Sequence, residues 1–299
     1  MNRSMRKGDR QMNFRTDLAS ELKPDVENKT GGVRASREHY GEMEITTVEV
    51  ENEIGERLLG KPVGKYICFA LPPFMEPADM SLALKMIGAR LRAMLPPKRE
   101  RVLVVGLGNM EITPDALGPK TAQKVLATEH IRRELGEVAG LEKLKSVAVF
   151  TPGVLGKTGI ESVELIRGAV RSVKPDAVIA IDAFAARESE RLGNTVQIAS
   201  SGICPGSGVG NSRKAVNEET LGVPVISIGV PTVVDASTLV REVAGENALK
   251  KVMPFGREMF VTPREIDALI ERGSQLISRV LNSVLQPDYT LEEIQALMS

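Results

Sequence analysis

The feature that most constrains the fold is a series of short, unbroken apolar runs that alternate with stretches of helical periodicity. The runs begin with RVLVVGLGN at residue 101 and continue with SVAVFTPG, DAVIAIDA, TVQIAS and VPVISIGVP. Such runs are typical of strands that are buried on both faces of a sheet. Apolar residues spaced three and four apart predict helices at residues 116–135, 159–173, 236–249 and 264–285. The alternation predicts an α/β fold, with a mostly parallel sheet flanked by helices.

The part of the chain before residue 101 has a different pattern. Residues 1 to about 40 are polar with little periodicity, and their composition predicts a mobile arm. Residues 44–52, EITTVEVEN, alternate in polarity and predict a strand, and residues 64–71 predict a second one. These two strands are expected to form a hairpin or the antiparallel edge of the sheet. Residues 81–95 have helical spacing, so one α/β domain is expected to follow the arm.

Composition excludes several classes of function. Lys and Arg together number 39, as do Asp and Glu, so no net charge draws the chain to nucleic acid or to anionic membrane. Aromatic residues are 3% of the chain, too few for stacking platforms. No apolar stretch approaches the roughly 20 residues of a spanning helix. The basic leader has no apolar run of a signal peptide. Cys68 and Cys204 lie far apart, which favours a reducing, cytoplasmic compartment.

Three aspartates follow predicted strands, where open parallel sheets bind their ligands. Asp115 comes after the first apolar run, Asp182 is placed at the last position of the third, and Asp235 follows the VPVISIGVP run. Each could simply cap a turn or helix, and capping is the preferred interpretation of Asp235. Asp115 and Asp182, however, are expected at one sheet edge. Two carboxyl groups in one crevice can differ in pKa, so one could activate water while the other protonates a leaving amine.

Other motifs support no competing chemistry. GLGN at residues 106–109 does not complete a dinucleotide-binding GxGxxG pattern. The glycine-rich loop at residues 200–211 is either a flexible connection or a backbone surface that lines a cleft. His39 and His130 follow no strand end, so a Ser–His–Asp triad and a histidine zinc site both lack residues. We expect no cofactor and no metal, and any metal would have to be held by carboxylates.

Six segments together resemble the germination protease family of spore-forming bacteria. They are VGLGN…TPDALGP, FTPGVLGKTGIES, KPDAVIAIDAFAAR, TVQIASSGICPGSGVGNSRK, LGVPVISIGVPTVVDA and MFVTPREID, and the similarity extends from about residue 14 to residue 270. The resemblance implies an atypical aspartic endopeptidase on a fold similar to that of hydrogenase maturation proteases. It places the two catalytic aspartates at Asp115 and Asp182, with Phe184 where the family motif has leucine. It also implies a homotetramer in the spore core that begins the degradation of small acid-soluble spore proteins.

The same resemblance gives the arm a role, because the family is made as a zymogen that removes its own N-terminus. The segment TDLASEL at residues 16–22 is similar to the context T-E-(F/I)-A-S-E-F in which the family cuts. Autocleavage is therefore predicted between Asp17 and Leu18, which divides the chain into a propeptide arm, residues 1–17, and a single peptidase domain, residues 18–299. An extended peptide could dock by its backbone along an edge or cleft. Thr16 could alternatively cap a helix.

Cleavage after an acidic residue calls for a cationic partner, and the candidates near the motif loops are Arg187, Arg213 and Lys214. Which aspartate acts as base and which as acid stays open at this point. Two other classes of function also stay open. One is a metal-dependent maturation peptidase or a phosphorolytic transferase on a related fold. The other is a binding module without enzymatic activity, with the arm as a docking peptide.

Overall fold

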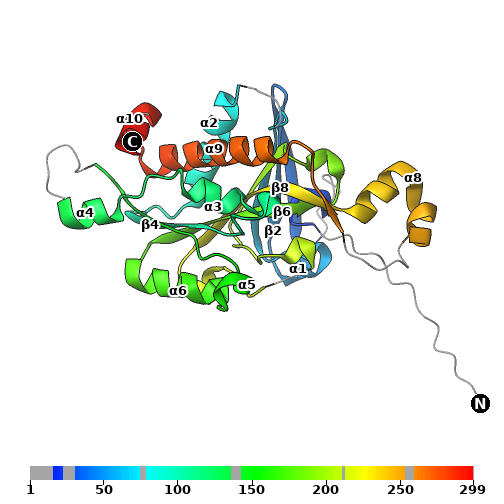
Figure 1. The fold of residues 1–299 in the computed structure, drawn as a ribbon, viewed down its shortest axis with the longest axis horizontal. Helices are drawn as coiled ribbons and strands as arrows, with labels where there is room; N and C mark the ends of the chain where they lie inside the picture. The colour runs from blue at the N-terminus through cyan, green and yellow to red at the C-terminus, as the bar shows by residue number, and fades with distance from the viewer. Residues whose placement is uncertain are drawn as a thin grey trace, which may run out of the picture.

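The structure is a computed structural model that describes residues 16–22, 31–74, 79–135, 143–210, 213–252 and 259–298 (Figure 1). Most of the predicted arm, residues 1–15, lies outside the described residues. The strands are β1 (Val33–Tyr40), β2 (Met43–Val50), β3 (Gly64–Ala70), β4 (Arg101–Gly106), β5 (Ser146–Phe150), β6 (Ala177–Ala186), β7 (Thr195–Ala199), β8 (Val225–Asp235) and β9 (Phe260–Val261). They form one sheet in the order β1-β2-β3-β7-β8-β6-β4-β5, and β9 pairs with β8.

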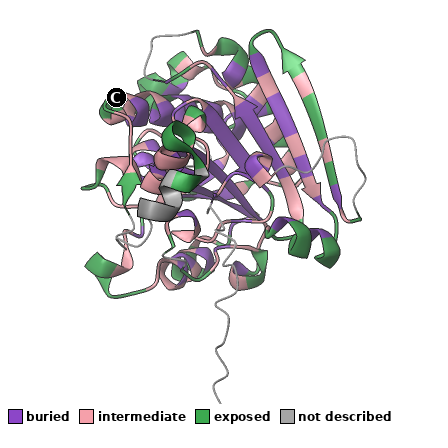
Figure 2. Cartoon of the chain, turned by 90° about the vertical axis from the view of Figure 1, so that its right-hand side faces the viewer, coloured by how far each residue is buried: buried purple, intermediate pink, exposed green. Residues whose placement is uncertain are grey.

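The predicted parallel strands form one half of this sheet. β5, β4, β6 and β8 pair in parallel, with Val104 opposite both Val149 and Ile179. The central strands are buried along nearly their whole length, which explains their unbroken apolar sequences (Figure 2). The α/β prediction is confirmed. The sequence TVQIAS was expected to be another parallel strand. It forms β7, which runs antiparallel to both β3 and β8.

The other half of the sheet is antiparallel and includes part of the predicted arm. β2 and β3 pair as expected, but residues 33–40 are not a mobile arm: they form strand β1 at the outer edge of β2. The sequence VRASREHY of β1 is mostly polar because an edge strand exposes much of its surface and carries charges that discourage further pairing. The composition of residues 33–40 therefore resembles that of an unstructured segment.

Helices cover both faces of the sheet (Figure 1). They are α1 (Glu53–Leu59), α2 (Ser81–Met94), α3 (Leu117–Ala122), α4 (Glu129–Leu135), α5 (Leu155–Thr158), α6 (Ser162–Val173), α7 (Glu218–Leu221), α8 (Ala236–Val252), α9 (Ile266–Leu285) and α10 (Leu291–Met298). On one face, α2, α3 and α9 pack onto the largest apolar cluster, and α9 contributes Leu269, Ile277 and Leu281 to it. On the opposite face, α6 and α7 cover Leu103, Val105 and Val178.

The helix predicted at residues 116–135 is wrong in its continuity. It is two helices, α3 and α4, separated by a segment that runs beside β5. Thr128 holds that segment, since its backbone N–H donates to the carbonyl of Val147 at 2.8 Å. This N–H is therefore given to the sheet, while the N–H of Leu126 donates to Oδ1 of Asn282, and the helix does not continue.

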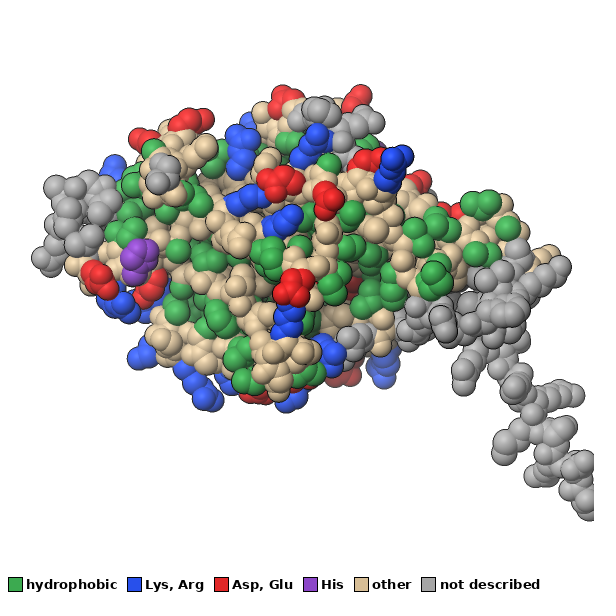
Figure 3. Space-filling view, in the orientation of Figure 1, with side chains coloured by type: hydrophobic (Ala, Val, Ile, Leu, Met, Phe, Trp, Pro, Cys, Tyr) green, Lys and Arg blue, Asp and Glu red, His purple; other side chains and the backbone are tan. Residues whose placement is uncertain are grey.

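The surface seen in Figure 3 mixes acidic and basic side chains over the same face. This distribution matches the equal numbers of acidic and basic residues in the sequence. None of the helices in the described residues has the length and apolar character that crossing a membrane requires.

Candidate active site

Asp182 lies within strand β6 and is 6% exposed. The sequence placed it at the end of the strand, and this is corrected: β6 continues to Ala186, with a change of register against β8 between Phe184 and Ala185. One carboxylate oxygen accepts a hydrogen bond from the backbone N–H of Ala183 at 2.9 Å. Burial raises the pKa of Asp182 well above its usual range, and the negative charges of Asp115 and Asp17 raise it further.

Asp115 ends a short 3₁₀ turn, η2 (Thr113–Asp115), in the loop after β4. Gly108 allows this loop to fold back, because its φ of 111° suits glycine and a Cβ there would overlap the carbonyl oxygen of Asp115. The Asp115 carboxylate accepts from the backbone N–H of Asn109 at 2.8 Å, so the side chain holds the loop and does not cap α3. The hydroxyl of Thr232 on β8 anchors the turn at the carbonyl of Pro114. Burial raises the pKa of Asp115 to about 6.

Both aspartates line one cavity of about 630 Å³ at the carboxyl ends of the parallel strands. Its walls come from the loops after β4 and β5, from β6 and β8, and from the glycine-rich loop around Gly206. The structure therefore brings together the two side chains that the strand-end pattern singled out. Asp17, which lies far from them in sequence, lines the same cavity.

The peptide around Asp17 is docked beside the two aspartates. The backbone N–H of Asp17 donates to the carbonyl of Ala185 at 2.9 Å, and the N–H of Ala185 donates to the Asp17 carboxylate, also at 2.9 Å. The hydroxyl of Ser207 donates to the other carboxylate oxygen at 2.7 Å. Ser207 belongs to the glycine-rich loop, so the interpretation of that loop as a surface lining a cleft fits its position.

The residues after Asp17 are buried as well. Leu18 is fully buried against Phe184, Ala186 and Val234, in an apolar pocket that closes over its side chain. The backbone N–H of Ala19 donates to Oε1 of Gln197 at 2.8 Å, while Nε2 of Gln197 donates to the carbonyl of Asp17 at 3.0 Å. The bond between Asp17 and Leu18 thus lies between two hydrogen bonds to the same side chain.

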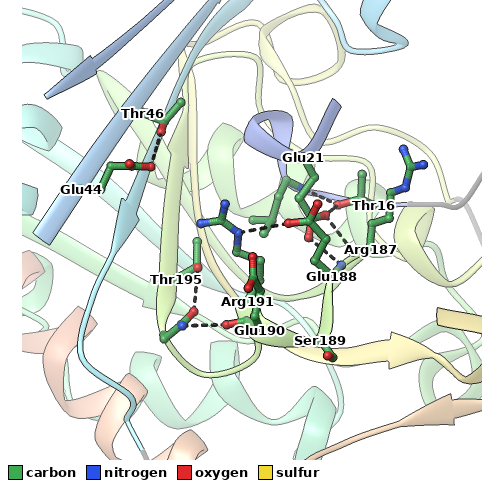
Figure 4. A network of polar contacts seen from close by, with 12 residues as sticks. Thr16, Glu21, Glu44, Thr46, Arg187, Glu188, Ser189, Glu190, Arg191 and Thr195 are labelled. Carbon is green, nitrogen blue, oxygen red and sulfur yellow. Dashed lines mark hydrogen bonds and ion pairs between the residues drawn. The ribbon is translucent and has the colours of Figure 1, made fainter. Parts of the chain in front are cut away.

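The second part of the docked segment forms a turn, whereas the sequence suggested that an extended peptide could dock (Figure 4). Residues Ala19–Leu22 form a 3₁₀ turn, η1, and Glu21 within it is 3% exposed. The Glu21 carboxylate accepts from the backbone N–H groups of Arg187 and Glu188 at 2.8 and 2.9 Å. It also accepts from the hydroxyl of Thr16, whose oxygen in turn accepts from the N–H of Leu18. Burial raises the pKa of Glu21.

Among the residues that the structure describes, one cation that the sequence did not single out contacts this segment. Lys61, after α1, donates from Nζ to the carbonyl of Thr16 at 2.8 Å. Burial lowers the pKa of Lys61, and the negative charges of Asp17 and Glu21 partly oppose this effect. Of the predicted candidates, Arg213 lines the cavity, and Arg187 meets Glu21 through its backbone N–H. Lys214 donates to Glu164 at 3.2 Å. The Asp17 carboxylate accepts from the backbone N–H of Ala185 and the hydroxyl of Ser207, and neither donor is a cation of the kind that the sequence predicted.

In the part of the chain that the structure describes, no group of three or more His, Cys, Asp and Glu side chains is arranged to hold a metal ion. Asp115 and Asp182 are the two carboxyl groups of the cavity that the sequence singled out. Both have raised pKa values, and they differ in burial, because Asp182 is the more deeply enclosed. Such a pair can hold one proton between two groups at neutral pH.

A family model described as germination protease matches residues 10–251 of the chain. The chain belongs to the germination protease family. A germination protease of Caldanaerobacter subterraneus is 40% identical, over 96% of this chain and 98% of the relative. A germination protease of Clostridium perfringens is 35% identical, over 96% of this chain and 99% of the relative. The family and the names of these relatives assign a peptidase activity.

One solved structure among those found is the NiFe hydrogenase maturation protease HycI from Thermococcus kodakarensis. It is 20% identical to this member of the germination protease family and has a TM-score of 0.36. The alignment covers 64% of this chain and 98% of HycI.

Proposed function

We propose that the chain is an endopeptidase of the atypical aspartic type, made as a zymogen that cuts its own arm between Asp17 and Leu18. The observation that carries the proposal is the position of Asp17 in the cavity that Asp115 and Asp182 line. The segment around the cut is bound through the backbone and the acidic side chain of Asp17 and through the buried Leu18. A peptide held in this way beside two carboxyl groups supports hydrolysis over simple docking.

In the proposed mechanism Asp115 is the general base and Asp182 the general acid. Asp182 is the more buried of the two and lies near two other carboxyl groups, and both effects raise its pKa and favour its protonated form. Asp115, with a pKa of about 6, is mostly ionised there. Asp115 takes a proton from water as the water oxygen bonds to the carbonyl carbon of Asp17. Asp182 then gives its proton to the nitrogen of Leu18 as the carbon–nitrogen bond breaks, which leaves a new carboxylate and a new amine.

The contacts of the arm describe the substrate that the same site would accept in trans. It would have an acidic residue before the cut, held by Ala185 and Ser207, and an apolar residue after it, buried beside Phe184. A glutamate four residues after the acidic residue that precedes the cut would be held by the N–H groups of residues 187 and 188. These features support small acid-soluble spore proteins as substrates, since the family resemblance describes the same pattern of residues. Family membership further supports a role in the spore core and assembly as a homotetramer.

The test is the intact mass of the purified full-length chain before and after incubation. The unaltered chain should lose the mass of residues 1–17, whereas Asp115→Asn and Asp182→Asn should keep their full mass at least ~10²-fold longer, the size of one acid–base contribution. The control is Asp288→Asn, an exposed aspartate between α9 and α10. An unaltered chain that keeps residues 1–17 and leaves a TDLASEL peptide intact would overturn the proposal. Loss of cleavage on adding a chelator would instead favour a metal-dependent peptidase.

A further inference from the structure

Gln197 is a buried polar residue that the two-aspartate mechanism does not use. It lies on β7, is 3% exposed, and points its side-chain amide at the docked arm. Nε2 donates to the carbonyl oxygen of Asp17 at 3.0 Å, and Oε1 accepts from the N–H of Ala19 at 2.8 Å. The carbonyl it touches belongs to the bond that the proposed function breaks.

The orientation of this amide follows from chemistry. The group beside one end is a backbone N–H, which can only donate, and the group beside the other is a carbonyl, which can only accept. A reversed amide would place its NH₂ against a donor and its oxygen against an acceptor. Cys68 on β3 adds a second donor to Oε1 at 3.3 Å, so the same end is fixed from the protein side too.

The sheet holds Gln197 on the same face as the general acid. Gln197 and Asp182 are both paired with Gly229 of β8, from its two sides, and directly paired residues share a face. The ring of Phe184 packs against Gly229, where a Cβ atom would overlap it. A donor on a central strand with neighbours on both sides keeps its position during a reaction, as preorganised stabilisation requires.

We propose that Gln197 is a further catalytic residue, whose Nε2–H group stabilises the negative charge that develops on the carbonyl oxygen of Asp17. This inference rests on the proposed cleavage between Asp17 and Leu18. As water adds to the carbonyl carbon, the π electron pair of the C=O bond moves to the oxygen and strengthens its hydrogen bond to Nε2. Gln197 neither gains nor loses a proton. The pair returns when the bond to the nitrogen of Leu18 breaks and that nitrogen takes its proton from Asp182.

The same side chain also holds the N–H of Ala19, on the far side of the scissile bond. Docking and charge stabilisation therefore have to be separated by the choice of variant. Gln197→Glu keeps an oxygen for Ala19 but replaces the donor that faces Asp17, whereas Gln197→Met removes both hydrogen bonds at nearly constant size. Removal of one donor of this type typically lowers kcat about 10²- to 10³-fold.

The experiment follows the first-order loss of residues 1–17 by intact mass in the full-length chain, with Gln275→Glu on the exposed face of α9 as the matched control. The rate constants of Gln197→Glu and Gln197→Met should fall about 10²-fold or more, and the control should match the unaltered chain. Hydrogen exchange at the N–H of Ala19 should stay slow in Gln197→Glu, which shows that the arm is still docked. Folding of each variant is checked by circular dichroism.

Folded variants that trim themselves within about threefold of the unaltered rate would overturn this inference and leave the proposed function standing. Slow cleavage of Gln197→Glu with rapid exchange at its Ala19 N–H would overturn it too, because Gln197 would then act only in docking. If neither variant folds, the Gln197 amide protons are measured by NMR in the uncleaved Asp115→Asn chain. Protection of these protons from exchange supports the contact, and rapid exchange overturns it. An unaltered chain that cuts nothing overturns the proposed function and the inference together.

Discussion

Gly208 lies against the carboxylate of Asp17, so closely that a Cβ atom at position 208 would overlap one of its oxygens. The same Cβ would also meet the side chain of Ala185, whose N–H donates to that carboxylate. The Asp17 carboxylate therefore packs directly against the backbone of Gly208, and it can do so because residue 208 has no side chain. Ala185 cannot move away cheaply, because it belongs to the central strand β6.

Gly208→Ala is therefore expected to slow the loss of residues 1–17 by about tenfold or more, because the Asp17 carboxylate can no longer reach both of its donors. The measurement is the rate of self-trimming by intact mass. Gly168→Ala is the control, since it lies on the exposed side of α6 with open space around it and favours the helix. Trimming at an unchanged rate in Gly208→Ala would show that Asp17 is cut from a different position.

The two candidate catalytic residues could be found from the sequence because a general rule about parallel sheets locates them. Asp115 and Asp182 follow or lie within strands whose apolar runs are unmistakable, and such strands deliver their carboxyl ends to one crevice. The arm could be connected to that crevice only through the family resemblance. Residues 16–22 have no periodicity that predicts the 3₁₀ turn at Ala19–Leu22.

The residues that sequence reasoning missed depend on contacts between distant segments. Gln197 lies in a strand that reads as a uniform core strand, and only the pairing of β7 with β3 and β8 turns its side chain toward the arm. Lys61 is one of many lysines and is marked only by its contact with Thr16. β1 was missed because edge strands resemble polar loops in composition.

Lys61→Met should weaken docking of the arm and slow self-trimming several-fold. It removes the hydrogen bond to the carbonyl of Thr16 and the positive charge near Asp17 and Glu21. A lost charge-assisted bond of this kind costs about 1.5–3 kcal/mol, reduced here because the side chain is partly exposed. The control is Lys65→Met, which removes an ion pair with Glu49 on the exposed sheet surface. Equal rates in the two variants would contradict a role for Lys61.

The rate of self-trimming should form a bell when plotted against pH. On the acid side, Asp115 must lose its proton to act as base, so the rate should fall as pH drops below about 6. On the alkaline side, Asp182 must keep the proton that burial and the neighbouring carboxylates hold on it, so the rate should fall again as that proton is lost. The profile is measured by intact mass in buffers of constant ionic strength. A rate that rises steadily as pH falls below 5 would rule out Asp115 as the base.

The last prediction concerns stability, because a carboxyl group with a raised pKa opposes folding when it is ionised. The pKa of Asp115 is about 6 in the folded chain against an ordinary value of 3.8, so the folded state binds more protons between these pH values. The contribution of Asp115 to the free energy of unfolding should therefore fall as pH rises from about 4 to 6 and stay low above it. In an Asp182→Asn background, where neither chain trims itself, Asp115→Asn should remove this loss. It should raise stability at pH 7 by about 1–2 kcal/mol, after allowance for partial exposure, and by almost nothing at pH 4. Urea unfolding at the two pH values measures the difference. An equal effect at both would mean that the substitution acts through packing and that Asp115 is not held at a raised pKa.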